Sequence, residues 1–115
     1  MNVGVTTTRN ADHSSKRWYP TTPQRTRAIL QEHGAITVVE CWGDDVPEGK
    51  LTSFPMAVQR KPDETVVFGW ITWSSREARD AGMKKATDDE RLKKIEMPLD
   101  GSRMIFGGFK SFITL

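Results

Sequence analysis

Glu40 is the residue whose surroundings most suggest chemistry. It alternates with Val38 and Trp42 along one predicted strand, so its carboxyl group shares a strand face with apolar side chains. Such surroundings raise the pKa of a carboxyl group and would suit it to act as a general base in a cavity. We favour the alternative of an ion pair across the sheet with Arg103 or Lys50, because structural pairs also perturb pKa values.

Three aromatic side chains, those of Trp42, Trp70 and Phe109, could line a pocket for a flat or apolar ligand. Aromatic residues on a sheet face more often belong to a core or a subunit interface, and we favour that interpretation. The residues expected to contact a small-molecule ligand are Glu40, Trp42, Asp44, Trp70, Arg103 and Phe109.

The loop after Trp42 carries the carboxylates of Asp44, Asp45 and Glu48. Hard oxygen ligands of this kind suit a divalent cation, but their spacing is not that of a calcium-binding loop. Pro47 and the glycine that follows Glu48 are typical of a simple turn. We therefore expect a structural turn and no metal site.

For Cys41 and His33 we also favour structural roles over chemical ones. Cys41 alternates with Val39 on the predicted strand, so we expect a small buried apolar residue rather than a nucleophile. His33 precedes Gly34 at a predicted helix end, where the helix dipole favours a cation. No second histidine or cysteine stands at ligand spacing from His33, and we expect no cofactor.

A sheet must position these side chains, and its spine is the β-branched and aromatic run Glu64–Trp73. Both faces of this run are apolar enough to be covered. A capping box at Ser74 and Glu77 predicts a helix to about Ala86, and a second one at Thr87 predicts a short helix to about Ile95.

The rest of the chain supplies the partners of this strand. We expect a weak strand over Asn2–Thr8, a helix over Thr22–His33 and a strand over Ala35–Trp42. Thr52–Arg60 is ambiguous, and a Ser53 cap favours a short helix there. The last strand spans Arg103–Ile113, and its paired glycines at 107 and 108 indicate a bulge or a close approach by another group.

This order predicts an α+β fold, the ferredoxin-like β-α-β-β-α-β plait, with an antiparallel sheet and helices on one face. We divide the chain into a poorly defined segment, residues 1–22, and the domain of residues 23–115. Tryptophan and phenylalanine occur on both faces of the sheet. An exposed apolar face usually marks association, so we expect a homodimer with two sheets packed face to face.

Length and composition set limits on the class of protein. With 115 residues, 37% of them hydrophobic and 28% charged, the chain fits one soluble globular domain. A net charge of +2 predicts neither a nucleic-acid nor a membrane partner, and basic residues of the predicted helices alternate with acidic ones, as on a solvated face. One cysteine, and no long apolar run or signal sequence, favour a cytoplasmic location.

Four segments resemble the YbaA-like family of small bacterial proteins of unknown function: Glu40–Lys50, Val66–Ser75, Arg79–Gly82 and Met97–Phe109. The resemblance implies membership of the dimeric α/β-barrel superfamily, whose ferredoxin-like protomers pair sheet to sheet. Met1–Thr26 departs from the family, which opens with an apolar strand and a long helix with an early tyrosine. The family also usually has proline at position 74 and phenylalanine at position 99.

Relatives within that superfamily include cofactor-independent monooxygenases, haem-degrading enzymes, lactone isomerases and stress-response proteins. A shared fold does not select among these activities. Our first hypothesis is a homodimer that binds a small molecule in a cleft between sheet and loops. The alternatives are an oxygenase- or isomerase-type enzyme using Glu40, and a purely structural or interaction protein.

Overall fold

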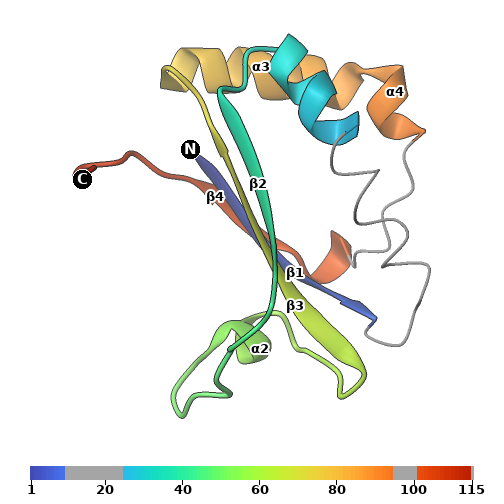
Figure 1. The fold of residues 1–115 in the computed structure, drawn as a ribbon, viewed down its shortest axis with the longest axis vertical. Coiled ribbons are helices and arrows are strands. Elements are labelled where there is room, and N and C mark those ends of the chain that lie inside the picture. The colour runs from blue at the N-terminus through green and yellow to red at the C-terminus, as the bar shows by residue number, and fades with distance from the viewer. Residues whose placement is uncertain (10–24, 95–100, 115) are drawn as a thin grey trace.

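The computed structural model describes residues 1–9, 25–94 and 101–114. Within these ranges, four strands form one antiparallel sheet in the order β2-β3-β1-β4 (Figure 1). The strands are β1 (Asn2–Arg9), β2 (Thr37–Trp42), β3 (Glu64–Thr72) and β4 (Ile105–Gly108). The helical segments are residues 25–32, α2 (Phe54–Ala57), α3 (Arg76–Asp88), α4 (Glu90–Lys93) and the 3-10 turn η1 (Gly101–Arg103).

This arrangement is an α+β fold consistent with the predicted ferredoxin-like plait. The strand predicted at the N-terminus lies at the centre of the sheet, because β1 pairs with β3 on one side and with β4 on the other. The predicted start of the first helix at Thr22 and the predicted turn at Met97 lie outside the described residues.

Strand register divides the side chains between two faces, since directly paired residues point to the same side. We call the side that α3 covers the helix face; it carries Val38, Glu40, Trp42, Val67, Gly69, Ile71, Asn2, Gly4, Thr6, Phe106 and Gly108. The opposite face carries Val39, Cys41, Val66, Phe68, Trp70, Val3, Val5, Ile105 and Gly107.

One end of the helix face holds the first part of the core. Leu30, Trp73 and Ala86 are buried there, with Val38 and Ile71 of the sheet packed against them. Helix α3 packs tightly at Gly82, where an added Cβ would overlap the Trp73 ring and lie 2.7 Å from the main-chain oxygen of residue 33. The glycine that weakens α3 by its propensity is therefore the residue that lets the helix pack.

A second core lies on the opposite face. Val5, Val58 and Val66 are buried there, with Val46 and Phe68 packed against them. This cluster is covered by α2 and its flanking loop, at the end of the sheet away from α3 (Figure 1). The prediction of helices on one face only is thus wrong, because α2 covers part of the other face.

Local sequence signals place most of the helix boundaries. The first helix ends in a Schellman arrangement: Gly34 has φ 107°, and the Ala35 amide donates to the Leu30 carbonyl at 3.1 Å. The preference for a helix within residues 52–60 is confirmed by α2, where the Ser53 hydroxyl accepts from the Met56 amide at 3.1 Å.

Two predicted caps are wrong. Ser75, not Ser74, caps α3 by accepting from the Ala78 amide at 3.0 Å. Asp89, not Thr87, caps α4, because α3 continues to residue 88 and the Thr87 hydroxyl instead donates to the Met83 carbonyl inside it. At each site two candidates lie within two residues of each other, and the end of the preceding element decides which of them caps the helix.

The last strand is shorter than predicted. β4 stops at Gly108, and beyond it the Phe109 amide donates to the Met1 carbonyl at 2.7 Å. The expected close approach at the paired glycines is present, because an added Cβ on Gly108 would overlap the Arg79 guanidinium. Across the described ranges, no helix combines the length and apolar character needed to cross a membrane.

Candidate functional site

A cleft of about 550 Å³ opens between α3 and the helix face of the sheet. Its volume lies within the usual range for small-molecule sites. The lining is mostly apolar, and two ionisable side chains, Glu40 and Arg79, contribute to it. The residues around it are Asn2, Val3, Gly4, Thr6, Glu40, Val67, Gly69, Trp70, Ile71, Arg79, Met83, Met104, Phe106, Gly107 and Gly108.

A cross-strand row explains why a cleft exists here. Glu40 pairs with Gly69, Gly69 with Gly4, and Gly4 with Phe106, so two glycines lie side by side at the middle of the sheet. A Cβ on Gly4 would have no atom nearer than 3.9 Å among its surroundings. The floor of the cleft is therefore bare backbone at Gly4, and we call this row the glycine floor.

Glu40 turns its carboxyl group inward over this floor. The residue as a whole is exposed on the edge strand β2, but its Oε2 lies 2.7 Å from where a Cβ of Gly69 would stand. Desolvation by burial raises the pKa of this carboxyl group. Among the described residues it has no hydrogen-bond or ion-pair partner, so the expected pairing with Arg103 or Lys50 is wrong.

Arg103 pairs with Glu64 instead. Its Nη1 and Nη2 donate to the two carboxylate oxygens at 2.7 and 2.5 Å, and Nη1 also donates to the Gln59 carbonyl at 2.7 Å. The Arg103 hydrogen bonds, against an opposing effect of burial and with help from the Lys61 amide, lower the pKa of Glu64 to about 2. Arg103 stands away from the cleft lining and connects η1 to the start of β3.

The predicted aromatic wall is divided by the sheet. Trp42 is on the helix face and Trp70 on the opposite face, so the two rings cannot line one cleft. The Trp70 ring instead contacts Phe68, with centroids 5.8 Å apart, and Phe68 contacts Phe54 at 5.9 Å. Phe109 is 57% exposed beyond the end of β4.

Asp44 lies in a separate, mostly polar hollow of about 180 Å³ at the other end of the sheet, together with Glu48, Arg60 and Glu64. Arg60 donates to Glu48 at 2.6 Å across it. Cys41 is only half-buried, on the opposite face of the sheet, which corrects the expectation of full burial.

Of the six residues predicted to contact a ligand, the cleft lining therefore includes Glu40 by its side chain and Trp70 by its main chain. Sequence reasoning missed Arg79 and Met83 on α3, and Gly4 in β1. Arg79 is one of the basic residues that alternate with acidic ones in the predicted helices, and this pattern predicts a solvated face. Arg79 and Met83 are four residues apart and therefore lie on the same side of a helix. Because Arg79 is charged, the sequence gave no reason to expect this side to face the sheet.

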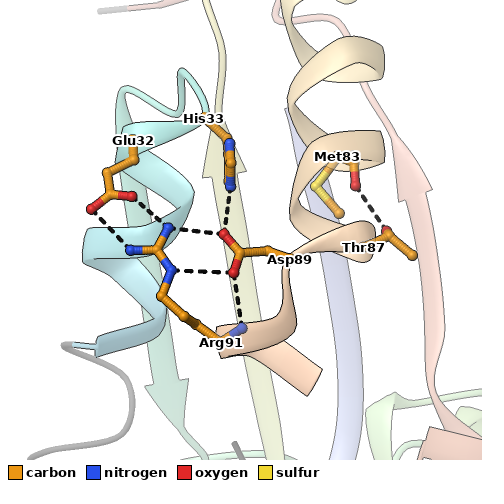
Figure 2. Close-up of polar contacts among 6 residues, drawn as sticks. All are labelled: Glu32, His33, Met83, Thr87, Asp89 and Arg91. Atoms are coloured by element: carbon orange, nitrogen blue, oxygen red, sulfur yellow. Dashed lines mark hydrogen bonds and ion pairs between the residues drawn. The ribbon is translucent and has the colours of Figure 1, made fainter. Parts of the chain in front are cut away.

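A second group of ionisable residues joins the helices to one another (Figure 2). Arg91 donates to Asp89 at 2.9 Å and to Glu32 at 2.5 Å, and His33 Nε2 lies 2.8 Å from Asp89. Hydrogen bonds from Arg91, and then from His33, hold the pKa of Asp89 well below its usual range. The group links the end of the first helix to the junction of α3 and α4, and it serves packing rather than the cleft.

Comparison with known proteins gives relatives whose names assign no activity. Residues 10–101 match the model of a family described as "Protein of unknown function (DUF1428)". The chain is 51% identical over 87 residues to the "Uncharacterized protein YbaA" of Escherichia coli strain K12, and equally to that of Shigella flexneri. In both cases the match covers 74% of this chain and 74% of the relative.

Proposed function

Because the chain belongs to this YbaA-like family of proteins of unknown function, its relatives suggest no substrate, and we propose a function from the cleft itself. The protein binds a small, largely apolar molecule on the glycine floor, as a homodimer. The observation that carries this proposal is the pair of glycines in register beneath α3, bordered by a carboxyl group without a partner among the described residues.

The free energy that these residues cost the fold supports a binding role. Glycine in a strand interior weakens the strand, since it adds no side chain to pack and loses more backbone entropy on folding. Of the two glycines side by side in the central strands, Gly69 makes room for the Glu40 carboxyl group and Gly4 leaves space for another molecule. A carboxyl group desolvated without a partner among the described residues adds a further cost, which a donor on a ligand would offset.

The experiment places a side chain on the glycine floor and leaves the rest of the sheet unchanged. Gly4→Val projects a side chain into the cleft, where space is open, while the control Cys41→Val changes a half-buried side chain on the other face of the sheet, away from the cleft lining. We expect a naphthol or naphthoquinone found by thermal-shift screening to raise the melting temperature of the wild type and of Cys41→Val, but not of Gly4→Val. An equal rise in all three proteins would place the bound molecule elsewhere and overturn the proposal.

Homodimer formation is the second part of the proposal. On the opposite face, Phe54 is 50% exposed and Ile105 is 45% exposed, and beyond β4 Phe112 is 93% exposed. Apolar surface of this extent around a sheet is typical of a protein that associates. A second copy packed against this face would cover it and leave the cleft on the helix face accessible.

An enzyme is the alternative, and one observation favours it. A carboxyl group with a raised pKa, lying in a cleft and free of ion pairing within the described residues, has the properties of a general base. Glu40→Gln separates the two functions: in an enzyme it retains ligand binding and loses turnover. In a binding protein, no conversion of the ligand occurs with either side chain.

A further inference from the structure

We infer that the ligand of the cleft is a monoanion, an apolar body bearing one carboxylate, and that Arg79 of α3 binds this carboxylate. This inference rests on the proposed binding function and adds the chemical class of the ligand. It begins from two arginines on one helix that differ sharply in their surroundings.

The Arg79 side chain is mostly buried, whereas that of Arg76 on the same helix is exposed. The Arg79 side chain is 18% exposed, whereas that of Arg76, one turn earlier on α3, is 79% exposed. Both pair with Asp80, which is itself exposed: Arg79 at 3.3 Å and Arg76 at 3.8 Å. Asp80 therefore gives no reason for the burial of Arg79.

The guanidinium of Arg79 retains unused donors. Its Nε and Nη2 donate to Asp80 at 3.3 Å, which is long for a charge-assisted hydrogen bond. Its Nη1 has no acceptor in the part of the chain that the structure describes. A guanidinium removed from water with donors left over is the arrangement that recognises a carboxylate.

Gly108 makes room for this arrangement. A Cβ at that position would overlap Nη1 and Cζ of Arg79, so the guanidinium lies directly on the backbone of β4. The second of the paired glycines thus serves the arginine, at the end of the cleft away from Glu40.

The distribution of charge sets the class of ligand. Glu40 lies over β3 and Arg79 over β4, two strands away and two residues along, so the two groups are about 12 Å apart by the spacing of strands and residues. Between them the lining is apolar, with Met83, Met104 and Ile71. One guanidinium at one end and a carboxyl group at the other favour a ligand with a single negative charge, at the Arg79 end only.

The test uses three probes of the same shape: 4-phenylbutyrate, its neutral amide and the corresponding amine. We expect isothermal titration calorimetry to show the carboxylate binding wild type most tightly. Arg79→Gln should weaken carboxylate binding about tenfold or more, the usual effect of losing a charge-assisted hydrogen bond, and leave amide binding within about twofold. Arg76→Gln removes the same charge and the same Asp80 partner, and should leave both affinities unchanged.

Gly108→Ala provides a second variant that keeps the charge but displaces it, and it should also weaken carboxylate binding. Circular dichroism verifies that each variant is folded. Equal binding of carboxylate and amide by wild type, or equal losses in Arg79→Gln and Arg76→Gln, would overturn the anion inference and leave the binding function standing. Failure of all three probes and of the naphthol and naphthoquinone screen would instead reject the binding function itself.

Discussion

Arg103 and Glu64 form the most enclosed ion pair among the described residues, with side chains 15% and 8% exposed. Both guanidinium contacts are short, and the Lys61 amide adds a third hydrogen bond to the carboxylate at 2.8 Å. Removing one partner of such a pair leaves the other charge buried and without a counter-charge. At the scale of single residues, the loss of one partner of an ion pair is therefore expected to cost most at this pair.

We predict that Arg103→Met lowers the free energy of unfolding by about 3 kcal/mol at pH 7. Because the pKa of Glu64 is about 2 when folded, below its ordinary 4.5, the pair stabilises the protein above pH 4.5, and this stability is lost as the pH falls toward 2. Urea denaturation across that range should show the difference between wild type and variant shrinking as the pH falls. A difference that stays constant with pH would contradict the pairing, and Arg76→Met is the exposed control.

Gly82 shows how packing outweighs propensity at the scale of an element. In an exposed helix, replacing glycine by alanine stabilises by about 1 kcal/mol. In α3, the added methyl group would meet the Trp73 ring and the main-chain oxygen of His33, and both belong to packed structure. The helix must then move away from the sheet or the indole must leave its place.

We therefore predict that Gly82→Ala lowers stability by about 1–3 kcal/mol, the usual cost of an overpacked core. Thermal unfolding followed by circular dichroism measures the change, and tryptophan fluorescence reports any displacement of Trp73. The control Ala81→Gly, at an exposed position of the same helix, should lose about 1 kcal/mol from propensity alone. Stabilisation by Gly82→Ala would show that the helix has room to adjust.

Association is a property of the whole molecule, and two neighbouring residues of β4 can test it. Ile105 is on the opposite face and Phe106 on the helix face, and both are exposed, at 45% and 83%. We predict that wild type elutes as a dimer at micromolar concentration. A lysine at position 105 would bury a charge in the interface, so Ile105→Lys should give the monomer mass.

The matched variant Phe106→Lys adds the same charge on the other side of the sheet and should remain dimeric. Size-exclusion chromatography with light scattering measures all three masses. A monomeric wild type would reject the dimer, and dissociation by Phe106→Lys alone would move the interface to the helix face. A monomeric wild type would leave the cleft unaffected, because one protomer contains it, whereas an interface at Phe106 would involve the cleft lining.

Much of the local structure follows from the sequence by itself, because its causes are local. The β-branched run at residues 64–72 forms a strand. Gly34 ends the first helix in a left-handed backbone conformation that few other amino acids adopt readily. Ser53 and Pro55 predict α2. The prediction of a ferredoxin-like plait follows from the succession of these elements, since few topologies accommodate it.

Only the tertiary structure decides which side chains meet. The sequence suggests that Glu40 pairs with Arg103 or Lys50, whereas the fold pairs Arg103 with Glu64 and leaves Glu40 over the glycine floor. Register also separates Trp42 from Trp70, because a shift of one residue moves a side chain to the other face. Arg79 turns inward because Gly108, which is 29 residues later, leaves space beneath it. Such pairings join distant parts of the chain, and no local pattern encodes them.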